Sequence, residues 1–278
     1  STIEEGIALY EHEWLHGISS SFELRGRHIS SNRYVPMILP DGRSLHGIND
    51  ASIRIGLRLS KDETIVRMPF EVRHMGSKYP IFSFDFTGAK RGVLPASYDY
   101  LRLEGRMQYR LNLPPVGYSR LMLEGGKIFG KVPYLLLKLH EGNGTYFYDR
   151  YAFSCMNFYE FSSDAWISFF YEHHFNGFLL GRVPLLKKLN WREVFVFKGV
   201  YGTLSARNDG SLPNTKAVML FPVGMSSVEH PYLETGFGIE NIFRLLRVDF
   251  IWRLTHHRPI PGLSIPTFTV NFSLNLKF

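Results

Sequence analysis

The chain ends in the eleven residues FTVNFSLNLKF (268–278), in which apolar and polar side chains alternate without a break. Successive side chains of a β-strand point to opposite faces of a sheet, so this pattern predicts a strand with one apolar and one polar face. The same period of two recurs upstream in LLRVDFIWRL (245–254) and in LRLEGRMQYRL (101–111). There the polar face consists largely of arginine with glutamate or aspartate, opposite Leu, Phe, Trp and Tyr. The sequence therefore predicts an all-β fold.

Alternating segments bounded by turn residues occur along the whole chain, and we predict twelve strands from them. They span residues 5–13, 19–29, 50–59, 63–73, 80–88, 97–111, 117–125, 164–175, 193–204, 231–240, 245–255 and 267–278. Two further segments, 151–161 and 216–224, would bring the number to fourteen.

The charged face decides between a β-sandwich and a membrane barrel. A sandwich turns its polar face to water, whereas a membrane barrel turns an apolar face to lipid and a polar face to its lumen. Rows of arginine and carboxylates opposite aromatic residues favour the barrel, and 15% of the residues are aromatic, as the two membrane interfaces require. We expect one domain, residues 1–278, forming a closed antiparallel transmembrane β-barrel of about 12–14 strands with a long extracellular loop near 126–163.

Composition excludes several classes of protein and site. The 278 residues carry a net charge of +7 without a block of like charge, so a nucleic-acid partner is not expected. No apolar run reaches the roughly 18 residues of a transmembrane helix. The single cysteine, Cys155, rules out an internal disulfide and a CxxC-type zinc site. Glu172 and His174 share a strand face but are too few for a zinc site, so we expect no metal and no cofactor.

Three long blocks carry a resemblance to a known family. They are PPVGYSRLMLEGGKIFGKVPYLLLKLHEGNGTYFYDRYAF (114–153), EHHFNGFLLGRVPLLKKLNWREV (172–194) and YLETGFGIENIFRLLRVDFIWRL (232–254). They resemble an outer-membrane family of Bacteroidetes-type bacteria, labelled as carboxypeptidase-regulatory-like-domain proteins with a C-terminal domain of unknown function. The resemblance implies the barrel part of a longer protein, without the family's N-terminal periplasmic regulatory-like domain, and it implies no peptidase activity.

A second, weaker resemblance is to the superfamily of barrels that assemble or export outer-membrane proteins, also called surface antigens. The order of Gly236-Phe237-Gly238, Leu246-Arg247-Val248-Asp249 and a final aromatic, Phe278, is similar to the end of those barrels. That superfamily folds a long loop into the lumen with an Arg-Gly-aromatic tip. Here Asp149-Arg150-Tyr151 lacks the glycine.

Candidate functional residues lie on the polar strand faces and in the long loop. We expect charged residues of the strands to face the lumen and pair, because a charge facing lipid at mid-bilayer costs roughly 2–4 kcal/mol. Arg150 of the loop is expected to hold it to lumen carboxylates such as Glu234 or Glu240. The candidate lumen and loop network comprises Arg150, Arg247, Asp249, Arg253, Glu234, Glu240, Arg102, Glu104 and Arg106.

The function that these features favour is a non-enzymatic component of the outer membrane of a Gram-negative bacterium, acting in assembly, export or as a scaffold of a protein complex. Its expected partners are the lipid bilayer with lipopolysaccharide and other outer-membrane or periplasmic proteins. A passive or gated solute channel is the first alternative. A membrane-embedded lipid-modifying enzyme is the second, although no Gly-x-Ser-x-Gly motif is present and we assign no catalytic residue.

Overall fold

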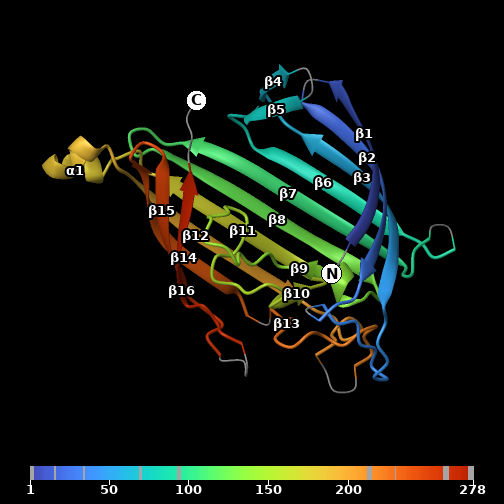
Figure 1. Cartoon of the computed structure of the whole chain (residues 1–278). Helices are drawn as coiled ribbons and strands as arrows, with labels where there is room; N and C mark the ends of the chain where they lie inside the picture. The colour runs from blue at the N-terminus through green and yellow to red at the C-terminus, as the bar shows by residue number, and fades with distance from the viewer. Residues whose placement is uncertain are drawn as a thin grey trace.

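The computed structural model describes residues 3–15, 17–33, 35–68, 71–92, 95–211, 215–228, 230–258 and 263–274. Eleven long antiparallel strands form one sheet, in the order β1-β2-β3-β6-β7-β8-β11-β12-β14-β15-β16 (Figure 1). Their bounds are β1 Ile3–Leu15, β2 Ile18–Ser30, β3 Gly47–Leu59, β6 Ile81–Ala89, β7 Tyr100–Asn112, β8 Tyr118–Gly130, β11 Ala165–His174, β12 Arg192–Thr203, β14 Tyr232–Ile242, β15 Leu246–Arg253 and β16 Phe268–Leu274.

The remaining elements are short. A hairpin of β4 (Thr64–Met68) and β5 (Glu71–Gly76) extends beyond the main sheet, and β9 (Lys138–Leu139), β10 (Phe161–Ser163) and β13 (Ser226–Ser227) form a small sheet. The helical elements are η1 (Tyr134–Leu136), η2 (Leu180–Arg182) and α1 (Pro184–Leu189). In the described part of the chain, no helix is long and apolar enough to cross a membrane.

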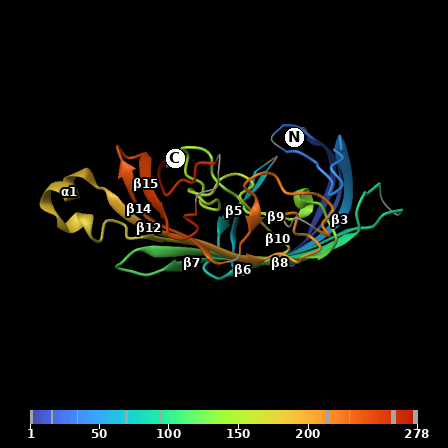
Figure 2. The same cartoon turned by 90° about the horizontal axis from the view of Figure 1, so that it is seen from below.

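The main sheet curves into a trough, with β1 to β3 rising on one side and β14 to β16 on the other (Figure 2). Hydrogen bonding runs from β1 to β16, and no pairing joins these two strands within the described residues. The predicted all-β antiparallel fold is confirmed at this level, whereas closure into a barrel stays a prediction.

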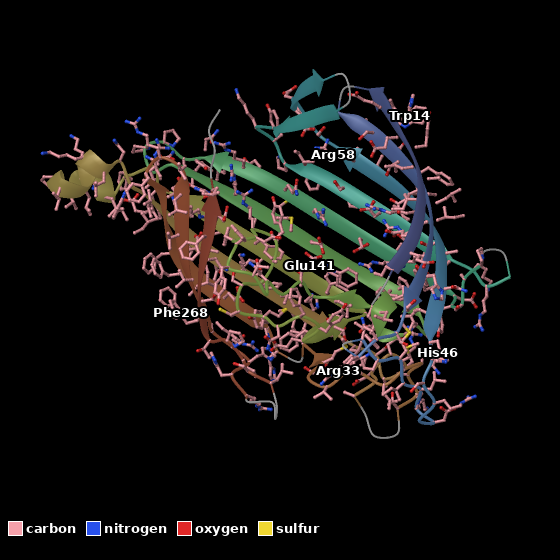
Figure 3. All side chains as sticks on the ribbon, viewed as in Figure 1. Trp14, Arg33, His46, Arg58, Glu141 and Phe268 are labelled. Atoms are coloured by element: carbon pink, nitrogen blue, oxygen red, sulfur yellow. The ribbon has the colours of Figure 1, made fainter. Side chains whose placement is uncertain are left out.

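The two faces of the sheet differ as the alternation predicts. Phe86, Ile167 and Phe237 on the convex face are 49%, 55% and 49% exposed. The strand residues that point to the other, concave face are buried, and Glu172 and Lys198 there are each 1% exposed. Figure 3 shows Trp14 and Phe268 on the strands at the two sides of the sheet, with Glu141 over the concave face between them. Apolar side chains therefore face outward and charged side chains inward.

One predicted strand is wrong. Residues 63–73 do not form a single strand of the main sheet, because β4 ends at Met68 and a second strand, β5, begins at Glu71. The sequence carries Pro69 at this point, and a proline has no N–H to give to a strand ladder.

The two optional strands are also wrong. Of residues 151–161 only Phe161 enters a strand, and 216–224 contains none. The main sheet therefore has eleven strands over the described residues rather than twelve to fourteen. The end of the last predicted strand, 275–278 with Phe278, lies outside the described residues.

Candidate functional site

The segment that joins β8 to β11, residues 131–163, lies over the concave face of the sheet (Figure 2), and we call it the inward segment. The predicted loop began at residue 126, but β8 continues to Gly130. Val132, Tyr134, Leu136 and Leu137 are each no more than 3% exposed and pack in one cluster with strand residues such as Trp166. An apolar stretch of this kind needs a cover, and here the trough supplies it.

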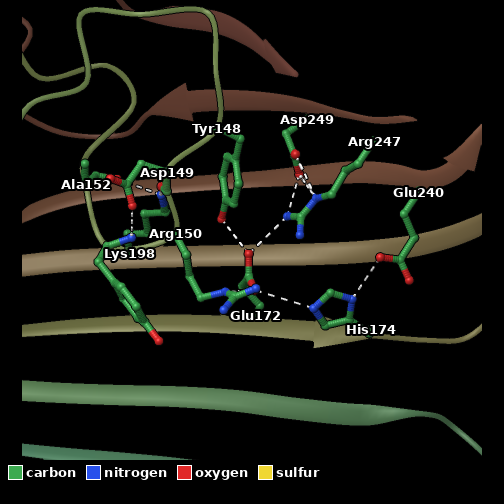
Figure 4. Close-up of polar contacts among 11 residues, drawn as sticks. Tyr148, Asp149, Arg150, Ala152, Glu172, His174, Lys198, Glu240, Arg247 and Asp249 are labelled. Atoms are coloured by element: carbon green, nitrogen blue, oxygen red, sulfur yellow. Dashed lines mark hydrogen bonds and ion pairs between the residues drawn. The ribbon is translucent and has the colours of Figure 1, made fainter. Parts of the chain in front are cut away.

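Glu172 of β11 is the centre of a buried polar network (Figure 4). Its carboxylate accepts hydrogen bonds from Tyr148 Oη at 2.7 Å, Arg150 Nε at 2.7 Å and Arg247 Nη2 at 3.1 Å. Two of these donors belong to the inward segment and one to β15. A carboxylate that is removed from water needs such charged or hydrogen-bonding partners, so Glu172 ties the segment to two strands.

Arg247 completes this network on β15. It donates to Asp249 from Nη2 at 2.7 Å and from Nε at 2.8 Å, and the Tyr148 ring lies 4.4 Å from its guanidinium carbon. Arg247 is 2% and Asp249 0% exposed. The two charges are therefore neutralised within the protein rather than by solvent.

The partner of Arg150 differs from the predicted one. Its guanidinium binds Glu172, and neither Glu234 nor Glu240 pairs with it among the described contacts. Glu240 lies 3.3 Å from His174 Nδ1, while Nε2 of the same ring lies 3.4 Å from Glu172. Over the described residues, no group of three or more His, Cys, Asp or Glu side chains is arranged to hold a metal ion.

Glu234 instead binds the backbone of the inward segment. Its carboxylate accepts from the N–H groups of Ser154 at 2.9 Å and Cys155 at 2.7 Å, and from Tyr232 Oη at 2.7 Å. Lys198 of β12 donates from Nζ to the carbonyl oxygens of Asp149 at 2.8 Å and Ala152 at 2.7 Å. Strand side chains thus satisfy backbone groups of the segment that have no ladder partner of their own.

Arg253 of β15 makes a third attachment. It pairs with Glu160 of the inward segment at 2.6 Å, and the two side chains are 1% and 2% exposed. The same guanidinium donates to the Cys155 carbonyl at 3.2 Å and the His256 carbonyl at 2.7 Å. Its planar fork therefore links the segment to the loop after β15.

The segment also pairs with the edge of the sheet. Tyr148 N donates to Phe272 O at 2.7 Å and Phe272 N donates to Tyr146 O at 2.7 Å, which makes a parallel bridge between Phe147 and Phe272. Asn271 Nδ2 adds a bond of 3.0 Å to Thr145 O. This part of the segment behaves as a short extra strand beside β16.

Two titratable groups of the inward segment are neutral near pH 7. Burial raises the pKa of the Cys155 thiol to about 12. Burial likewise lowers the pKa of the His140 imidazole to about 3, and its Nε2 lies 2.9 Å from Ser163 Oγ. Cys155 is fully buried beside Val196 and Ile251, so its sulfur reports whether the segment is seated.

The other predicted residues lie apart, over the amino-terminal half of the trough. Arg102 pairs with Glu104 at 2.7 Å and Arg106 with Glu124 at 2.7 Å. They border a cavity of about 300 Å3 that remains open to solvent, and the Arg106 side chain is 50% exposed. From the inward segment, Lys138 reaches this group, with its Nζ 2.7 Å from the Glu124 carboxylate.

Sequence reasoning missed several members of the network, namely Lys198, Tyr148, Glu160 and Glu124. Lys198 had a usable signal, because it has the inward parity of Val194, Val196 and Val200 in an otherwise apolar row. Glu124 likewise lies opposite Arg106 in the register of β7 and β8. Tyr148 and Glu160 lie in irregular chain, where no periodicity points to a partner.

Comparison with known proteins identifies both fold and family. A solved structure, described as BamA from Haemophilus ducreyi lacking POTRA domains 1–3, superposes with a TM-score of 0.55 at 11% identity. The alignment covers 98% of this chain and 54% of that one, so the chain spans about half the length of the structure it matches. At this identity the likeness shows the fold alone.

No curated protein matches in sequence. The family model that matches residues 11–206 describes a C-terminal domain of unknown function, and it shows nothing of a carboxypeptidase-regulatory-like domain. The match extends over more than half of the chain, which therefore belongs to the family of unknown function DUF5686, as its C-terminal domain.

Proposed function

We propose that this chain is an outer-membrane barrel domain of the assembly, export or scaffold type, whose lumen is filled on one side by the inward segment. One observation carries the proposal: buried ion pairs and backbone bonds from β11, β12, β14 and β15 hold the segment to the concave face. A segment attached this firmly suits a structural or partner-binding role better than free diffusion of solutes. The apolar convex face and the BamA-like fold support a membrane location.

The partners follow from the same geometry. Lipid and lipopolysaccharide would contact the apolar convex face, because exposed aromatic and aliphatic side chains there have no protein cover. Other outer-membrane or periplasmic proteins would bind at the rims and exposed loops. We assign no chemistry to the buried network, since its charged groups are engaged with one another.

Conductance and protein capture together test this function. The full-length protein, reconstituted in planar bilayers, should show no steady open pore, and mild-detergent purification from native membranes should retain the same partner proteins in repeated preparations. The comparison variant is Arg150→Ala, which should loosen the inward segment and so let ions pass, while it leaves the convex face unchanged. A large steady conductance of the parent, with no partner retained, would contradict the proposal.

The alternative is a solute channel, and the open half of the trough favours it. Arg25, Arg54 and Arg106 line the cavity of about 300 Å3 and are 31%, 40% and 50% exposed in their side chains. A channel would show a current that depends on these arginines. Arg54→Glu should then shift ion selectivity from anions toward cations.

A further inference from the structure

Two arginines lie directly opposite each other on β7 and β8. Arg110 and Arg120 are partners in the register of this strand pair. Like charges in directly opposite positions are destabilising. Four residues away on the same strands, Arg106 lies opposite Glu124 and pairs with it at 2.7 Å. The two strands therefore place one matched and one mismatched charge pair on the same face.

Within the described part of the chain, no carboxylate pairs with either of these two arginines. There, neither Arg110 nor Arg120 makes an ion pair or a side-chain hydrogen bond. Both guanidinium carbons lie over the Tyr118 ring, at 4.2 Å and 5.2 Å from its centre. A ring attracts a cation through its quadrupole but brings no negative charge, so the positive charge remains.

A third guanidinium faces the same space. Arg150 lines a cavity of about 280 Å3 together with Arg110 and Arg120, and Gln108 and Tyr151 add polar groups to its wall. Glu172 is the one carboxylate among its described lining residues. Its oxygens already accept hydrogen bonds from Tyr148, Arg150 and Arg247. The cavity therefore holds more positive than negative charge.

We propose that this cavity binds a phosphate group, with Arg110 and Arg120 as its principal ligands. Planar guanidinium forks match the oxygens of a phosphate and bind them in pairs. A phosphate also carries between one and two negative charges near pH 7, which balances the two unpaired arginines. When phosphate binds, the two arginines that repel each other across the strands both contact the same anion.

The experiment titrates the full chain, in detergent micelles and a low-salt buffer without phosphate, with inorganic phosphate. The heat of binding is measured by calorimetry, and the melting temperature is measured with and without phosphate. Parent protein should bind phosphate and melt at a higher temperature in its presence. Arg120→Gln and Arg110→Gln should each weaken binding at least tenfold. Without phosphate they should melt at or above the parent temperature, because one of two like charges is gone.

Arg182→Gln is the matched control. Arg182 is an exposed arginine that lies over an aromatic ring, 4.0 Å from the centre of Phe178, as Arg110 lies over Tyr118. This variant should bind phosphate as the parent does. The same loss in all three variants, or no binding by the parent, would overturn the proposal.

A second arm identifies the source of the phosphate. Dihexanoyl phosphatidic acid, below its micelle concentration, replaces inorganic phosphate in the same titration. Binding at least tenfold tighter than that of inorganic phosphate, lost in Arg120→Gln, assigns the site to a lipid headgroup. Equal binding of the two probes, lost in the same variant, assigns it to a soluble phosphate compound. Binding of the lipid that Arg120→Gln leaves unchanged would contradict the site.

Discussion

The two halves of the trough use the same residue types with different results. Over β11 to β16, the strand arginines and carboxylates that contact the inward segment are almost fully buried, as in the pair of Arg253 and Glu160. Over β2 to β8, pairs such as Arg54 and Asp85 remain 40% and 24% exposed. When its partner is removed, a buried charge is left without solvation, whereas water solvates an exposed charge. Burial by the inward segment, rather than the number of ion pairs, should therefore decide how much each pair matters.

The largest expected effect is that of Glu172→Ala. This change removes the carboxylate that Tyr148 and the buried Arg247 share, and it leaves Arg150, whose side chain is 34% exposed, without its ion-pair partner. Removal of one partner of a buried pair costs about 3–5 kcal/mol. Urea unfolding of the full chain in micelles should show this loss of unfolding free energy. A midpoint equal to that of the parent would mean that water reaches the network and that the two halves do not differ.

A smaller effect is expected from Lys198→Met, which keeps the length of the side chain but removes its three donors. Two carbonyl groups of the inward segment, those of Asp149 and Ala152, lose a charged donor. Hydrogen bonds to charged groups contribute roughly 1.5–3 kcal/mol each, and relaxation of the segment recovers part of this. Limited proteolysis should cut the inward segment faster than in the parent. Equal cleavage rates would exclude Lys198 as an anchor.

The smallest effect is expected from Glu104→Ala in the open half. Glu104 and Arg102 are 24% and 23% exposed in their side chains, so water replaces the lost contact. The change in unfolding free energy should be about 0–1 kcal/mol and should shrink further at high salt. A loss as large as that of Glu172→Ala would erase the proposed contrast between the halves.

The strands of the main sheet were predictable because each one separates an apolar from a charged face. Alternation finds β7 or β15 from the sequence alone, since outward-facing and inward-facing residues differ in polarity along these strands. It fails at 63–73, where Pro69 interrupts a pattern that otherwise reads as continuous. It also fails at 151–161, where Phe153 of the inward segment packs against strand residues such as Phe170 and does not itself lie in a strand.

The candidate site was less predictable than the sheet. The alternation of side chains along the strands predicts that Arg247, Asp249 and Glu234 point inward. It does not predict which of them the irregular inward segment contacts. Arg150 could choose among several inward carboxylates, and its pairing with Glu172 depends on the path from Gly130 to Asp149. The position of the partly buried Tyr148 and the edge pairing with Phe272 depend on that same path, which no periodicity in the sequence predicts.

The rate of Cys155 alkylation tests the seating of the inward segment most directly. Cys155 is the chain's single cysteine and is fully buried, with its thiol pKa raised by burial to about 12. At pH 8, the lower thiolate fraction alone should slow its reaction with a maleimide roughly a thousandfold relative to the urea-unfolded chain. Glu172→Ala should restore much of the rate, and Glu104→Ala none. Rapid labelling of the folded parent, at the rate of the unfolded chain, would contradict a seated segment.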